Sequence, residues 1–236
     1  ESYRRFFPGK QVTPVVMASP SCYLDIGNSY ALEEAKAHGL PAYYCTNWDS
    51  DEEEILGALK NGFVGIKPYQ NNSPSWIPAA DVRIFDFLTP RQLELMDRIG
   101  GIVMLHIPRA LRLRDPINLH QMMEIDEKYP NAKVVIAHIG RAYVPEDLGN
   151  AFDTLKNSKH LYFDFSANCS KDAMEALFTN IGTERIMFGS DMPFTCMRMY
   201  RIDDGGKYVN VVPRGLYGGV DSDPHMRESD EKNITT

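Results

Sequence analysis

The sequence predicts an α/β fold built on a parallel sheet, in the form of a TIM-type (β/α)₈ barrel that lacks its first strand. Short apolar runs alternate with amphipathic helical segments along most of the chain. The runs recur every ~20–40 residues, which leaves room for one crossover helix between each pair of strands. Three of the runs end in a histidine or an aspartate, as expected where the strands of a barrel open onto an active face.

Several of the expected strands are apolar throughout, which is typical of parallel strands covered on both faces. The seven runs are Val12–Ala18, Ala42–Thr46, Phe63–Lys67, Ile102–His106, Val134–His138, His160–Phe165 and Arg185–Ser190. Seven strands leave two architectures, an open doubly wound sheet and a barrel that has lost a strand. The first run is not followed by a glycine-rich phosphate loop, which weakens the nucleotide-binding form of the open sheet.

The helical segments between these runs carry recognisable end signals. Thr89 followed by Pro90 predicts an N-cap with proline at the first helical position, and Gly100 lies where the helix should end. Asp49 or Ser50 is expected to cap a helix over Glu52–Lys60. Further helices are expected at Ser29–His38, Ile117–Tyr129, Glu146–Asn157 and Lys171–Asn180.

The length favours a single domain over residues 1–236, because a barrel of this type typically has about 250 residues. The tail over residues 195–236 is rich in glycine, aspartate, arginine and tyrosine, and we expect a long loop there. Its closing stretch, Arg227–Thr236, is polar and is expected to begin a further helix.

The composition favours a soluble cytoplasmic protein. A net charge of −7 argues against nucleic acid or an anionic membrane as the main partner. The four cysteines are widely spaced and form no CxxC pair, so free thiols in a reducing compartment are expected. The sequence shows neither a signal peptide nor an apolar run of the roughly 18 residues that a membrane helix needs.

The candidate catalytic groups are His106, His138 and Asp191, each at the end of an apolar run. Each alone could be an ordinary hydrogen-bonded residue or a helix cap, but all three in barrel order favour a metal site. Imidazole nitrogen and carboxylate oxygen suit zinc, iron or manganese. A bound cation would activate water, and a carboxylate such as Asp191 could take that water's proton.

These residues resemble the amidohydrolase superfamily, and specifically its amidohydrolase-2 branch of metal-dependent hydrolases and decarboxylases. The resemblance spans about residues 12–195, and the matching segments are 63–67, 103–106, 134–140 and 185–194, the last with its Phe-Gly-Ser-Asp-x-Pro ending. It implies that His106 binds metal, that His138 polarises substrate or water or binds metal directly, and that Asp191 binds metal and shuttles protons. Lys67 stands where binuclear relatives carry a carboxylated lysine, although in this branch it more often remains an ordinary cation.

The chain departs from the family in one respect, because the His-x-His pair of the first strand does not occur in it. The remaining histidines are His38, His120, His160 and His225. Together with the count of seven strands, this leads us to expect a fragment without its first strand. A true loss of the pair would put metal binding and catalysis in doubt.

Lys67, Arg109 and Arg141 follow the strands that carry the candidate ligands, and they would suit a substrate that bears a carboxylate. The alternative is that they pair with acids such as Asp86, Asp115 or Asp164.

The leading hypothesis is a hydrolase that cleaves an amide, lactone or related bond in a small acidic molecule through metal-activated water, with zinc as the first choice of metal. A non-oxidative decarboxylase on the same site is the close alternative, and a noncatalytic barrel follows if the His-x-His pair is truly absent. The acidic balance disfavours a nuclease. Relatives often form dimers, so a homodimer is a possible assembly.

Overall fold

Six parallel strands form the central sheet in the computed structural model of the chain, which describes residues 2–20, 23–168, 170–231 and 234. They are β1 (Tyr43–Tyr44), β2 (Gly65–Ile66), β3 (Ile102–Leu105), β4 (Lys133–Ile136), β5 (Tyr162–Asp164) and β6 (Ile186–Met187). Their spatial order is the same as their order in the chain. A doubly wound sheet reverses its order at a switch point, so this sequential order is that of a barrel. The expected fold class is therefore confirmed.

The sheet is curved but open within the described part of the chain, because no pairing there joins β6 to β1. The run expected as the first strand, residues 12–18, lies beside β1 and forms a single parallel bridge from Val16 to Ala42. The amide of Val16 donates to the Pro41 carbonyl at 2.8 Å, and the amide of Tyr43 donates to the Val16 carbonyl at 2.9 Å. That a further strand is missing stays a prediction.

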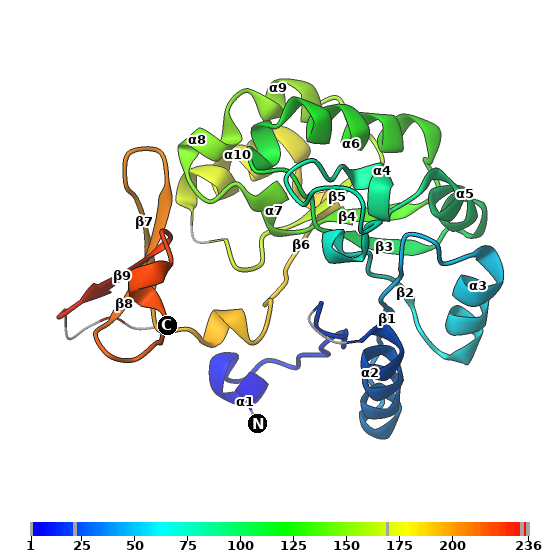
Figure 1. Cartoon of the computed structure of the whole chain (residues 1–236), viewed down its shortest axis with the longest axis horizontal. Coiled ribbons are helices and arrows are strands. Elements are labelled where there is room, and N and C mark those ends of the chain that lie inside the picture. Colours follow the sequence, from blue (N-terminus) through cyan, green and yellow to red (C-terminus); the bar gives the residue numbers. More distant parts are fainter. Residues whose placement is uncertain (1, 21–22, 169, 232–233, 235–236) are drawn as a thin grey trace.

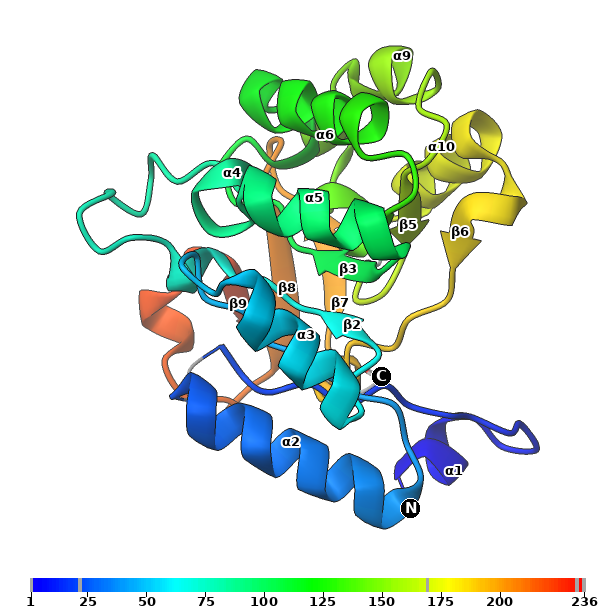
Figure 2. The same ribbon diagram turned by 90° about the vertical axis from the view of Figure 1, so that its right-hand side faces the viewer.

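The helices follow the strands closely and lie around the outside of the sheet (Figures 1 and 2). Those that match the expected segments are α2 (Leu24–His38), α3 (Glu52–Asn61), α5 (Pro90–Ile99), α6 (Pro116–Lys128) and α10 (Lys171–Ile181). The single helix expected over 146–157 is instead two short ones, α8 (Pro145–Leu148) and α9 (Ala151–Leu155), separated by a turn at Gly149. Two short helices were not expected, α1 (Ser2–Phe6) and α4 (Ile84–Phe87).

The helix caps were predicted in part. Thr89 begins α5, where its amide donates to the Gln92 side chain at 3.2 Å, and Gly100 ends the helix, as expected. The prediction of Asp49 or Ser50 as the cap of α3 was wrong by two positions or by one. Asp51 is the cap, and its Oδ1 accepts from the amide of Glu54 at 2.9 Å. An N-cap side chain reaches only the amides two or three residues further on, so the residue directly before Glu52 is the one that caps the helix, while the predicted start at Glu52 is confirmed.

The core lies between the sheet and the helices α5, α6, α9 and α10. Fully buried side chains come from both layers, for instance Leu93 and Met96 of α5 against Val103 and Leu105 of β3. This packing fixes the strands at one height, so their carboxyl ends meet at one edge. No helix in the described part of the chain is both long and apolar enough to cross a membrane.

The tail contains a small sheet instead of the long loop expected over residues 195–236. Its strands are β7 (Tyr200–Asp203), β8 (Tyr208–Pro213) and β9 (Met226–Ser229), with β7 antiparallel and β9 parallel to β8. The expected helix beginning at Arg227 is also wrong, because β9 occupies its first residues, and residues 232, 233, 235 and 236 lie outside the described part. The sheet stands beside the α/β body (Figure 1).

The chain leaves β4 through a left-handed turn, α7 (His138–Arg141). His138, Ile139, Gly140 and Arg141 have φ of 57°, 52°, 57° and 64°. This backbone conformation costs roughly 1–2 kcal/mol for each residue other than glycine, so neighbouring groups must hold it. Glycine is required at position 140 for a second reason, since a Cβ there would lie 2.4 Å from Leu113 Cδ1.

We expect Gly140→Ala to lower the free energy of unfolding by about 1–2 kcal/mol for the backbone, plus about 1–3 kcal/mol for the contact with Leu113. Gly100→Ala is the matched control, because Gly100 has a similar φ of 65° and open space around its Cβ position. Urea unfolding of both variants measures the difference. Equal losses in the two variants would show that the turn is not tightly packed.

Candidate active site

The residues predicted to carry the chemistry lie together at the carboxyl end of the sheet. His106 follows β3 directly, His138 follows β4 by two residues, and Asp191 follows β6 by four. The imidazole rings of His106 and His138 have centroids 5.5 Å apart. His138 Nε2 lies 4.0 Å from Asp191 Oδ2. The structure therefore brings all three to one place from strands that are far apart in sequence.

The ring of His138 is fixed by Ser166, in the loop after β5. His138 Nδ1 lies 3.0 Å from the Ser166 carbonyl oxygen and 2.8 Å from its hydroxyl. A carbonyl oxygen only accepts, so we assign the proton to Nδ1. The lone pair of the neutral ring is then on Nε2, the nitrogen that faces Asp191.

Asp164, the last residue of β5, holds this arrangement together. Its Oδ1 accepts from the His138 amide at 3.0 Å, from the Ser166 amide at 2.9 Å and from the Ser166 hydroxyl at 2.5 Å. From the sequence, Asp164 was expected only as a partner for rim cations, and Ser166 was not expected in the site. A polar residue at the end of an apolar run was the signal that selected the other three, and it applies equally to Asp164.

A glycine in the segment after β6 allows this packing. A Cβ at Gly189 would lie 2.9 Å from the Ser166 Cβ and 3.6 Å from Asp164 Oδ1. Any side chain there would displace the serine that fixes His138. The Phe-Gly-Ser-Asp segment therefore contributes two residues to the site: Gly189, which leaves space for Ser166, and Asp191.

Burial controls the charges in the site. Burial, with smaller effects of Lys67, Arg141 and His138, lowers the pKa of His106 well below its usual value. His106 is therefore uncharged at neutral pH, as a metal ligand must be. Burial raises the pKa of Asp191, while His138 and Lys67 oppose that rise. Burial also lowers the pKa of Lys67 to about 8, so this lysine is a cation at pH 7.

The three predicted substrate-binding cations have different surroundings. Lys67 is buried, with Nζ 5.2 Å from the ring centroid of Tyr69, and it forms no ion pair within the described residues. Arg109 donates from Nε to Asp115 Oδ2 at 3.1 Å, and Asp115 is also the N-cap of α6. Arg141 donates from one nitrogen to backbone carbonyls, the closest being that of Pro108 at 2.9 Å.

The candidate ligand atoms have the chemistry that a divalent metal requires, but their side chains are not arranged around one point. Uncharged His106, the Nε2 lone pair of His138 and the Asp191 carboxylate are suitable ligands. In the residues that the structure describes, however, no three histidine, cysteine, aspartate or glutamate side chains are arranged to hold an ion. The three side chains approach one another only in pairs, His106 with His138 and His138 with Asp191.

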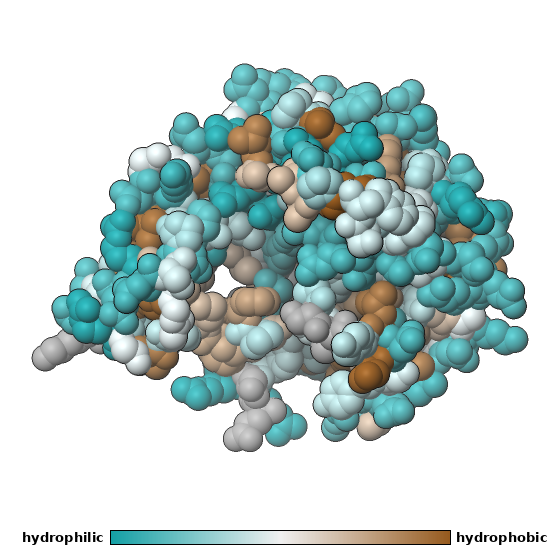
Figure 3. Space-filling view, in the orientation of Figure 1, coloured by the Kyte–Doolittle hydropathy of each residue, from teal (hydrophilic) through white to brown (hydrophobic). Residues whose placement is uncertain are grey.

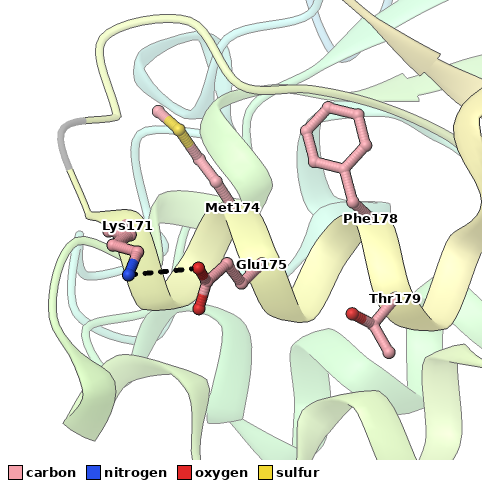
Figure 4. A pocket seen from close by; sticks show the side chains of 5 residues that line it. All are labelled: Lys171, Met174, Glu175, Phe178 and Thr179. Atoms are coloured by element: carbon pink, nitrogen blue, oxygen red, sulfur yellow. Dashed lines mark ion pairs between the residues drawn. The ribbon is translucent and has the colours of Figure 1, made fainter.

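Two surface hollows lie elsewhere. One runs along α10, lined by Lys171, Met174, Glu175, Phe178 and Thr179, with Lys171 and Glu175 in an ion pair of 3.3 Å (Figure 4). The other lies between α2 and α3 and is acidic. Neither hollow is lined by His106, His138 or Asp191. In the space-filling view a small opening lies between part of the tail and the α/β body (Figure 3).

Three solved structures resemble this fold, all at low identity. A zinc-bound amidohydrolase from Burkholderia multivorans has a TM-score of 0.53 at 13% identity, covering 73% of this chain and 66% of that one. A probable 2-pyrone-4,6-dicarboxylic acid hydrolase from Acinetobacter baumannii, with citric acid bound, has 0.51 at 17%, covering 71% and 64%. A 5-carboxyvanillate decarboxylase from Novosphingobium aromaticivorans, with manganese and 4-hydroxy-3-methoxy-5-nitrobenzoic acid, has 0.51 at 14%, covering 72% and 60%.

This chain thus spans less than two thirds of the length of each of these structures. No curated protein matches its sequence significantly. A family model described as amidohydrolase matches residues 8–201, which include every candidate residue of the site. The chain therefore belongs to the amidohydrolase family.

Proposed function

We propose that this protein is a metal-dependent hydrolase that cleaves an amide, lactone or related bond in a small molecule bearing a carboxylate. The observation that carries the proposal is the meeting of His106, His138 and Asp191 at the carboxyl ends of three parallel strands. Family membership supports an enzyme. The dicarboxylic acid hydrolase and the carboxyvanillate decarboxylase among the similar structures both carry an acid in the name of their substrate.

His106, His138 and Asp191 would hold the divalent metal. We favour zinc, with manganese and iron as alternatives, since one similar structure contains zinc and another manganese. When bound, such an ion polarises a carbonyl group and makes water a nucleophile near neutral pH.

The chain's own residues would supply proton transfer and substrate binding. Because burial raises the pKa of Asp191, its carboxylate is a better proton acceptor than an exposed one and can return the proton to a leaving group. Asp164 and Ser166 keep His138 in one tautomer. Lys67 would supply a buried positive charge for the substrate carboxylate, and Arg141 and Arg109 are proposed to contact the same carboxylate.

A non-oxidative decarboxylase is the second candidate, and the decarboxylase among the similar structures favours keeping it. The same side chains would serve both reactions. Incubating the protein with a panel of cyclic amides, lactones and hydroxybenzoic acids separates them. Ring opening without carbon dioxide supports the hydrolase, and release of carbon dioxide from the acids replaces it with the decarboxylase.

Metal content tests the ligands directly. We expect His106→Asn and Asp191→Asn each to lower zinc affinity more than tenfold, because each removes a bond to the ion. His120→Asn, on the exposed face of α6, is the matched control and should bind zinc as the unmodified protein does. Elemental analysis after dialysis measures the occupancy. Equal zinc in all four proteins would exclude this ligand set, and zinc in none would favour a noncatalytic barrel.

Burial of Lys67 predicts a pH-dependent stability. Below pH 8 the lysine is protonated in both the folded and the unfolded protein, so its burial cost is fully present. Between pH 8 and its usual pKa of 10.5 the unfolded chain binds more protons, and the folded state gains stability as pH rises. We expect Lys67→Met to be more stable at pH 7 by up to about 3 kcal/mol, from 2.5 pKa units at ~1.36 kcal/mol each.

The advantage of Lys67→Met should shrink between pH 8 and pH 10.5, since the unmodified lysine then loses its charge. Urea unfolding of both proteins at several pH values measures it. Lys60→Met, on α3, controls for the loss of a lysine outside the site. A constant difference across this pH range would show that Lys67 is not buried as a cation.

A further inference from the structure

Two arginines and two tyrosines join the tail sheet to the α/β body. We call Arg112, Tyr143, Arg201 and Tyr208 the arginine–tyrosine cluster. The tyrosine rings meet edge to face with centroids 5.0 Å apart. The Arg201 guanidinium carbon lies 4.4 Å from the Tyr143 centroid and 5.0 Å from that of Tyr208, and the Arg112 carbon lies 4.5 Å from Tyr208. Each arginine thus contacts one tyrosine from the body and one from the tail.

The body side of this cluster is rigid. Arg112 donates from one nitrogen to both carboxylate oxygens of Asp147, each at 2.8 Å. Asp147 also accepts from the backbone amide of Tyr143 at 3.0 Å. Burial raises the pKa of Tyr143, so this ring stays neutral while it contacts the two cations. The tail therefore docks on a surface that is already fixed.

Arg201 reaches beyond the cluster to the segment that holds His138. It donates from Nε to Asn210 Oδ1 at 2.9 Å within the tail sheet. Its Nη1 donates to the Ala167 carbonyl at 3.0 Å. Ala167 lies between Ser166, which contacts His138 Nδ1, and Asn168. One side chain of the tail thus touches the loop that orients the catalytic imidazole.

This loop also supports the left-handed turn after β4. Asn168 Nδ2 donates to the carbonyls of Ala142 at 2.8 Å and His138 at 3.3 Å. Ala167 itself has a φ of 48°, a conformation that a residue with a side chain rarely adopts without support. The bond from Arg201 to the Ala167 carbonyl provides such support from outside the barrel.

We propose that Arg201 is a positioning residue, through which the tail sheet holds residues 164–168 and so keeps His138 in its Nδ1-protonated orientation. The catalytic consequence rests on the proposed function, whereas the effect on His138 does not. Arg201 contacts neither His138 nor Asp191 in the hydrogen bonds and ring contacts of the described residues. It acts through Ala167 and its two neighbours.

Arg214 supplies the matched control within the same sheet. It pairs with Asp230 at 2.7 Å and Glu228 at 3.0 Å, both of the tail, and lies outside the cluster. Arg214→Met therefore removes an arginine from the tail without touching the loop after β5. Any effect common to Arg201→Met and Arg214→Met reports on the tail alone.

The test compares Arg201→Met, Arg201→Lys and Arg214→Met with the unmodified zinc-treated protein by hydrogen exchange and by the ¹⁵N spectrum of labelled histidine. In Arg201→Met we expect at least tenfold faster exchange over residues 138–142 and a His138 Nδ1–H signal broadened by faster exchange of that proton with solvent. Lysine restores one donor and should recover part of both effects, and Arg214→Met should show neither. An unchanged His138 signal and unchanged exchange in Arg201→Met would overturn the proposal.

A double-mutant cycle covers the case in which Arg201→Met loosens the tail. Exchange over β8 reports whether the tail stays docked. If Arg201 acts through the loop, its effect on residues 138–142 should shrink once Ser166→Ala has already removed the hydroxyl that joins Asp164 to the His138 ring, because the two changes break one chain of contacts. Additive effects would mean that Arg201 acts on stability only and would overturn the proposal.

Activity separates this inference from the proposed function. With a substrate in hand, Arg201→Met should lower kcat about tenfold and leave KM nearly unchanged, since it disturbs a catalytic orientation and not substrate contacts. A changed His138 signal in a protein without hydrolase activity would refute the proposed function and keep the positioning role. Normal kcat together with normal exchange in Arg201→Met would refute the positioning role and leave the proposed function in place.

Discussion

The carboxylate of Asp164 accepts three hydrogen bonds on one oxygen while its side chain is only 6% exposed. Those bonds come from the amide that begins the left-handed turn and from both donors of Ser166. A buried carboxylate is costly unless its lone pairs are satisfied, so the three donors and the acid must keep their places together. The orientation of His138 depends on this arrangement. Because the ring is held in this orientation, its Nε2 faces Asp191.

The left-handed turn after β4 shows how the fold holds an unfavourable backbone where it is useful. Three residues with side chains adopt positive φ there, at a cost that local contacts must offset. Asp164, Asn168 and Arg141 provide these contacts, Arg141 by donating to carbonyls of the neighbouring loop after β3. Arg141, which the sequence predicted to bind substrate, thus joins the loops after β3 and β4.

The tail adds a second layer of support around the same loops. Its strands pair with one another and not with the parallel sheet within the described residues, so the arginine–tyrosine cluster provides its main polar attachment to the body. A guanidinium between two tyrosines keeps its charge while covering apolar rings.

The sequence alone was enough to predict the parallel sheet, most of the helices and the meeting of His106, His138 and Asp191, because apolar periodicity and strand-end position depend on local chain geometry. It also contained an overlooked signal for the tail hairpin, since Asp204-Gly205-Gly206 between Ile202 and Val209 is typical of a tight turn between strands. The pairing of Arg109 with Asp115 was one of the alternatives that the sequence left open, and the structure shows it. Only the tertiary structure revealed that Asp164 and Ser166 hold His138 and that Arg201 reaches Ala167. The contacts of His138 and Arg201 join residues from different strands and loops, and their partners are set by how the layers pack, which no local pattern of residues encodes.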